Sequence, residues 1–108
     1  KEVEARNAQL LIVTLSTGIS VHPSETVRQQ AIEALQVEHL FYPDLRIESW
    51  ANEAEVPILT LGIPFQQYAI EQKAYLHGFE NAHLGGGHWN VEGHRLAADL
   101  ITEKLCND

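Results

Sequence analysis

The stretch LLIVTL, residues 10–15, decides the fold class, because its aliphatic residues follow one another with only Thr14 between them. An unalternating aliphatic run of this length predicts a parallel strand that is covered on both faces. A second run, VPILTL at residues 56–61, has the same character. Pro57 near its start fits the first residues of a strand, where one missing backbone donor is tolerated. The chain is therefore expected to be an α/β protein with two parallel strands.

The segments around the two strands have apolar residues at helical spacing and residues that favour helix ends. Ser24, Asp44 and Asn90 each precede such a segment and are expected to serve as N-caps. The order of elements predicts a βαβ unit with helical extensions, in which helices cover the faces of the sheet. The expected helices span residues 24–36, 44–54, 64–74 and 91–105, and residues 1–9 have the composition of a helix end.

Two strands alone make a poor sheet, because independently stable sheets usually have three or more. Each strand also leaves an open edge of unpaired backbone groups. We therefore expect residues 1–108 to be a single partial domain, whose missing strands come from an N-terminal half or from another copy in a homo-oligomer. The alternative is a complete small α-rich domain built around a two-stranded core.

The composition limits the classes of partner. Among 108 residues there are 7 Lys and Arg against 15 Asp and Glu, which gives a net charge of −8 and argues against nucleic-acid and anionic-membrane partners. The longest apolar runs fall far short of the ~20 residues that span a bilayer. The single cysteine, Cys106, cannot form an intrachain disulfide or a cysteine metal cage. Composition does not indicate a compartment.

Residues 77–95, which cover the loop before the last expected helix and the first turn of that helix, hold four of the six histidines and five of the seven glycines. In open α/β sheets, ligands bind beyond the carboxyl ends of the strands, and a loop at that edge can present a side chain to them. His88 lies two residues before Asn90 and follows three glycines, which permit unusual backbone dihedrals. Because imidazole suits acid–base catalysis near neutral pH, His88 is the candidate catalytic residue.

The block GHWNVEGHRLAA, residues 87–98, resembles the last sequence block of the SGNH hydrolases, also called GDSL-type esterases and lipases. Their pattern is an Asp, one or two residues, the catalytic His, and then Asn-x-x-Gly-His opening the C-terminal helix. The strand at residues 10–15, the segment YPD at residues 42–44 and the strand at residues 56–61 are also similar to the C-terminal half of that fold. The resemblance implies a partial three-layer, flavodoxin-like α/β fold, with parallel strands flanked by helices and the N-terminal half absent.

The resemblance also implies a mechanism. A serine attacks an ester carbonyl, a histidine takes its proton and passes it to the leaving alcohol, and an acid fixes the histidine tautomer. His88 matches the catalytic histidine, Asn90 a helix-capping position and His94 a packing or hydrogen-bonding position. The parent enzyme would act on a small-molecule or carbohydrate ester, such as an O-acetylated sugar, without a cofactor.

Two departures from the family pattern matter. The acid would fall at Gly85 or Gly86, so a backbone carbonyl or another carboxylate such as Glu80 would have to orient His88. The Gly-Asp-Ser block and the oxyanion donors of the family do not occur in the chain. The expected function is therefore the C-terminal part of an SGNH-type serine esterase that contributes His88 and is inactive alone.

Three other interpretations compete with this one. Ser16 follows the first strand but lacks a nucleophile elbow, so we expect it to line the crevice wall with Thr17 and Gly18 rather than to attack a substrate. A zinc site would need paired short spacings that the histidines lack, so no metal is expected. The missing acid favours a non-catalytic binding or assembly module on the same scaffold.

The other residues of this region have simpler expected roles. Trp89 is expected to be a packing anchor beneath the last helix, and His77 and His83 are expected to be loop residues with ordinary hydrogen bonds. Glu80 and Glu92 are the carboxylates that would lie nearest a histidine metal site.

Overall fold

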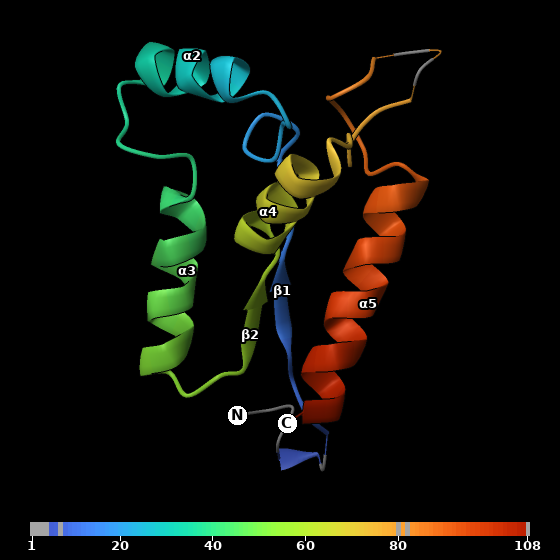
Figure 1. Cartoon of the computed structure of the whole chain (residues 1–108). Coiled ribbons are helices and arrows are strands. Elements are labelled where there is room, and N and C mark those ends of the chain that lie inside the picture. The colour runs from blue at the N-terminus through green and yellow to red at the C-terminus, as the bar shows by residue number, and fades with distance from the viewer. Residues whose placement is uncertain (1–4, 7, 80, 82, 108) are drawn as a thin grey trace.

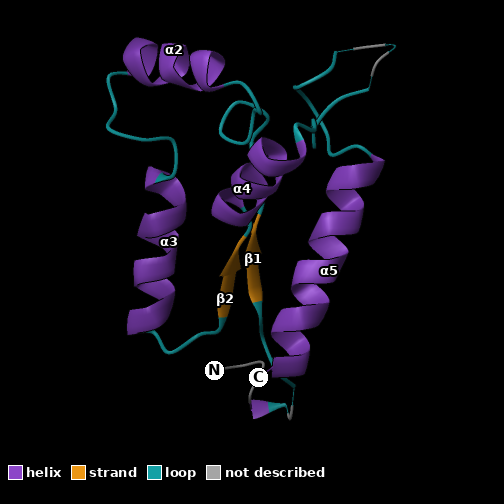
Figure 2. Cartoon of the chain, viewed as in Figure 1, coloured by secondary structure: helices purple, strands orange, loops and turns teal. Residues whose placement is uncertain are grey.

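The chain folds as an α/β protein, and its computed structural model describes residues 5–6, 8–79, 81 and 83–107. The predicted helix end over residues 1–9 lies largely outside the described residues. In the described part of the chain, no helix combines the length and apolar character needed to cross a bilayer. The elements, in chain order, are β1 (Ile12–Thr14), α2 (Glu25–Leu35), α3 (Tyr42–Glu53), β2 (Ile58–Thr60), α4 (Gly62–Gln72) and α5 (Val91–Asn107) (Figures 1 and 2).

The two strands pair in parallel, as their aliphatic character predicts. Ile12 lies opposite Ile58, and Thr14 lies opposite Thr60. Both strands are shorter than the aliphatic runs that contain them. Within the described residues the sheet consists of this one pair, so the edge of β1 away from β2 is open.

Helices lie on both sides of the strand pair. Val13 and Leu59, which face each other in the register, pack with Leu96 and Leu100 of α5 against the buried core. The next residue along β2, Thr60, turns to the other face, where its Oγ1 donates to Glu48 Oε2 of α3 at 3.4 Å. Figure 1 shows α3 and α5 on opposite sides of the strands, which confirms the prediction that helices cover the sheet.

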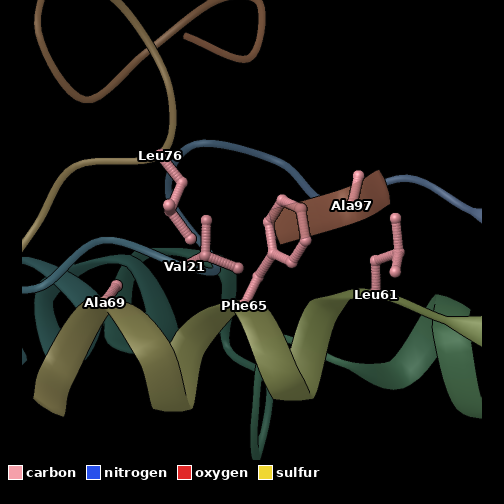
Figure 3. Close-up of a cluster of buried hydrophobic side chains, with 6 residues drawn as sticks. All are labelled: Val21, Leu61, Phe65, Ala69, Leu76 and Ala97. Carbon is pink, nitrogen blue, oxygen red and sulfur yellow. The ribbon is translucent and has the colours of Figure 1, made fainter. Parts of the chain in front are cut away.

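The hydrophobic core lies at the carboxyl end of the strands. Leu61 directly follows β2, and Phe65 and Ala69 come from the first turns of α4. Figure 3 shows the Phe65 ring, which is 0% exposed, between Leu61 and Ala97 on one side and Val21 on the other. The core therefore fixes the start of α4 and the middle of α5 beside the same edge of the sheet where the strands end.

Two helix starts differ from the sequence predictions. Asp44 was expected to cap the helix of residues 44–54, but α3 begins at Tyr42 with Phe41 as its N-cap. Pro43 is the reason, because proline lacks an N–H and fits the first turn of a helix. The Asp44 carboxyl accepts a hydrogen bond from the Gly62 backbone at the start of α4, and α4 begins two residues before Pro64. Burial, the largest influence, raises the pKa of Asp44, while this hydrogen bond opposes the rise.

Candidate functional site at the carboxyl edge of the strands

The loop between α4 and α5 lies beyond the carboxyl ends of the strands and projects away from the sheet (Figure 1). His77 and Trp89 form an antiparallel bridge at the base of this loop. The Gly78 N–H donates to the His88 carbonyl at 2.9 Å, and the Asn90 N–H donates to the Leu76 carbonyl at 3.0 Å. The two ends of the loop are therefore fastened to each other before the loop reaches its glycine-rich part.

A hydrogen-bonded pair of a partly buried serine and a buried histidine lies at this edge. Ser16 Oγ is 2.8 Å from His77 Nε2, and His77 Nδ1 is 2.7 Å from the Gly87 carbonyl oxygen. Because a carbonyl oxygen can only accept, the proton of the neutral ring lies on Nδ1. Nε2 is then the acceptor, and the Ser16 hydroxyl donates to it. His77 is 4% exposed, so this arrangement satisfies both nitrogens of a nearly inaccessible ring.

Trp89 attaches the other side of the loop to the same serine. Its indole Nε1–H donates to Ser16 Oγ at 3.1 Å. The Trp89 ring packs against Phe65 with centroids 5.5 Å apart, and the edge of His94 meets it at 5.3 Å. The contact with Phe65 confirms the predicted packing role of Trp89, while His94 is exposed on α5 and meets the same ring.

His88 lies between these attachments, and its side chain is exposed. Within the described part of the chain, its imidazole has no hydrogen-bond partner, whereas its carbonyl accepts from Gly78. Gly85 and Gly87 have φ of 94° and 81°, so two of the three glycines before His88 take up the unusual dihedrals expected of them. Glu80, the carboxylate suggested as an orienting group, lies outside the described residues. The catalytic role of His88 stays a prediction.

The sequence did not predict that Ser16 and His77 would meet. It assigned Ser16 to the crevice wall and His77 to the loop, 61 positions away. The one signal that was available is topological, since a residue following a strand and a loop preceding the last helix both lie at the carboxyl edge. That signal predicts proximity but not a hydrogen bond.

His22 borders the loop on its other side. Its Nδ1 accepts a hydrogen bond from the Ser24 N–H at 3.0 Å, and its ring meets Tyr75 edge-on at 5.2 Å. Gly85 lies against the same ring. Burial lowers the pKa of His22, and the positive charge of Arg28 lowers it further.

The histidines of the loop do not gather into a metal site. Among the residues that the structure describes, no group of three or more His, Cys, Asp or Glu side chains could hold a metal ion. Glu92, one of the two carboxylates considered for such a site, instead accepts hydrogen bonds from Tyr68 and Arg95.

No family model, no curated protein and no solved structure matches this chain. The motif at residues 87–98 and the geometry of the loop that contains it are therefore what indicates a function. Both concern the same edge of the sheet, the edge at which α/β proteins bind their ligands.

Asn90 provides the first test of the loop's attachment. Its Oδ1 accepts from the Gly93 N–H at 3.0 Å, which confirms the predicted N-cap, while its Nδ2 donates to the Tyr75 and Gly78 carbonyls at 2.8 and 3.1 Å. Asn90→Ser keeps a capping oxygen and loses both donors, whereas Asn90→Ala loses all three bonds. We expect urea unfolding to rank wild type above Asn90→Ser and that above Asn90→Ala, with each step about 1 kcal/mol. Equal stability of Asn90→Ser and wild type would show that the two carbonyl contacts contribute nothing.

The lowered pKa of His22 predicts a pH dependence of stability. As the pH falls below about 6.5, the unfolded chain binds a proton at this position before the folded chain does, so folding free energy is lost until the folded pKa is reached. His22→Asn keeps an acceptor for the Ser24 N–H but cannot be protonated. The urea midpoint of unfolding should therefore decrease less between pH 7.5 and pH 5.5 in His22→Asn than in wild type.

His39 gives the matched control for this measurement, because its Nδ1 accepts from the Phe41 N–H at 3.1 Å in the same local arrangement. His39→Asn should alter the difference between the two midpoints less than His22→Asn does. If both variants alter it equally, the surroundings of His22 are not the cause.

Proposed function

We propose that this chain is the C-terminal part of an SGNH-type serine esterase, acting on a small-molecule or carbohydrate ester. In this proposal His88 is the general base and acid, while the nucleophile and oxyanion donors belong to an N-terminal half outside the chain. The observation that carries the proposal is the setting of His88. Its exposed side chain projects from a fastened loop at the carboxyl edge of parallel strands, within the motif that resembles the family.

The chemistry requires a histidine that another segment can reach. A serine hydroxyl of the N-terminal half would attack the ester carbonyl, and His88 would accept the hydroxyl proton and return it to the leaving alcohol. The exposure of His88 supports this role, because a side chain buried within this chain could not meet a serine from outside it. His77 does not fit the role, since its two nitrogens are already bonded to Ser16 and Gly87.

The unpaired edge of β1 supports the proposal that an N-terminal half completes the sheet. An apolar groove of about 420 Å³ lies between β1 and α3, and its lining includes Ile12, Leu15, Leu40 and Ile47. Leu15, directly after β1, is 66% exposed. A strand whose outer edge is unpaired, lying beside an apolar groove, is suited to accept a further strand, from the N-terminal half or from a second copy.

A non-catalytic binding or assembly module on the same scaffold is the second candidate. It is favoured by the residues before His88, where Gly85 and Gly86 stand in place of the acid. Within the described residues, no carboxylate is hydrogen-bonded to the His88 ring. The two candidate functions are distinguished by whether ester hydrolysis depends on His88.

The esterase proposal predicts that residues 1–108 alone do not hydrolyse p-nitrophenyl acetate, whereas a polypeptide that also contains the N-terminal half does. In that polypeptide His88→Ala should lower kcat by about 10³-fold or more, because the proton acceptor is lost. His83→Ala, in the same loop, is the control and should leave kcat near wild type. Turnover by residues 1–108 alone that Ser16→Ala abolishes would contradict the assignment of the nucleophile to another segment.

The open edge predicts that residues 1–108 associate when no other strand is present. Light scattering should show a dimer or larger species, and Leu15→Lys should shift it toward the monomer, because a charge opposes burial of the edge. Gln67→Lys, at an exposed position of α4, is the matched control. A monodisperse wild-type monomer with cooperative unfolding would count against both the association and the partial domain.

A further inference from the structure

Three consecutive loop residues each make one hydrogen bond to the base of the loop or to the end of β1. The Gly87 carbonyl accepts from His77 Nδ1 at 2.7 Å, and the His88 carbonyl accepts from the Gly78 N–H at 2.9 Å. The Trp89 indole N–H donates to Ser16 Oγ at 3.1 Å. Since Ser16 and His77 are bonded to each other at 2.8 Å, the contacts close into a ring around the backbone of His88.

We infer that Ser16, His77 and Trp89 form a latch that holds the backbone on both sides of His88, and that Ser16 and His77 are positioning residues for it. This inference rests on the proposed function, in which His88 performs the proton transfer. A general base that is already held near its working position loses less conformational entropy when the reaction begins.

The chemistry of each latch residue fits this role. A neutral imidazole can donate from one nitrogen to the Gly87 carbonyl and accept with the other from the Ser16 hydroxyl. The serine oxygen can then accept from Trp89 while its own proton goes to His77. Each of the three donors, His77 Nδ1–H, the Ser16 hydroxyl and Trp89 Nε1–H, therefore has its own acceptor. These bonds fix the rotation of the Ser16 hydroxyl and the orientation of the His77 ring.

The latch is also attached to the end of β1 and to the buried core. Ser16 lies two residues after β1, and the Trp89 ring packs against Phe65 in the core. The side chain of His77 is 4% exposed. The backbone of His88 is thereby connected to both the sheet and the core, although its own side chain is exposed.

The same contacts argue against Ser16 and His77 as a second catalytic pair. A nucleophilic serine needs an accessible oxygen, and its base must deliver a proton to a leaving group. Ser16 Oγ is bonded to both Trp89 and His77, and the His77 ring is buried. Covalent labelling of Ser16 by a fluorophosphonate would therefore overturn the latch.

Amide exchange in residues 1–108 tests the latch without any enzymatic activity. Ser16→Ala removes the acceptor of Trp89 and the donor to His77, so the Gly78 amide, which is bonded to the His88 carbonyl, should exchange about tenfold faster. Ser16→Thr keeps the hydroxyl and should restore the wild-type rate. The Phe65 amide, which donates to the Leu61 carbonyl in the core, is the internal control and should not change.

A second variant separates the latch from the packing of the tryptophan. Trp89→Phe retains a ring against Phe65 but loses the indole N–H, and it should speed exchange at Gly78 as Ser16→Ala does. Unchanged exchange at Gly78 in both variants would overturn the inference, and so would equal acceleration at Gly78 and Phe65. In wild type, ¹⁵N shifts of the His77 ring should show the proton on Nδ1, and the opposite tautomer would contradict the latch.

Kinetics then distinguish this inference from the proposed function. In the polypeptide with the N-terminal half, Ser16→Ala should lower kcat with little change in KM, and Ser16→Thr should recover it. Turnover that needs His88 but is insensitive to Ser16→Ala would overturn the positioning role and leave the proposed function intact. Turnover that does not need His88 would overturn the proposed function, while the exchange result would still decide whether the latch exists.

Discussion

The hydrogen bond between Ser16 and His77 is the contact on which the carboxyl edge of this molecule depends. It joins the segment after β1 to the loop before α5, across 61 positions of the chain, and its imidazole partner is buried. A buried imidazole that lost this partner would leave a nitrogen unsatisfied, at a cost that exceeds the net gain of an ordinary hydrogen bond. The edge is therefore stable only when the strand end and the loop are both in place.

The fold could be predicted wherever its signals are local. Ser24 caps α2 through a hydrogen bond from the Val27 N–H, and Asn90 caps α5, because both contacts lie within three residues. The aliphatic runs predicted both strands, because a strand that is covered on both faces of the sheet has apolar residues at consecutive positions. The start of α4 was predicted less well, because Asp44 contacts Gly62 from a different helix and no local pattern encodes that contact.

In the candidate site, too, the local features could be predicted from the sequence and the long-range contacts could not. His88, its glycines and Asn90 form one continuous motif, so the position of the loop before α5 could be predicted from the sequence. Ser16 and His77 could not be paired, because neither has a neighbouring residue that marks it for a polar contact. The glycines allow the loop its positive φ angles, but the latch contacts determine where the loop is held.

The unpaired edge of the sheet and the backbone of His88 are connected through β1. Its outer edge has no strand partner among the described residues, and the segment that follows it holds the latch at Ser16. A strand that pairs with β1 would restrict the motion of that segment, because backbone hydrogen bonds to a neighbouring strand order the chain up to its end. On the proposed function, the same N-terminal half that brings the nucleophile would thus also steady the backbone of His88. Completion of the sheet and assembly of the catalytic residues would then be one event rather than two, since the same N-terminal half would pair with β1 and bring the nucleophile to the carboxyl end of the strands.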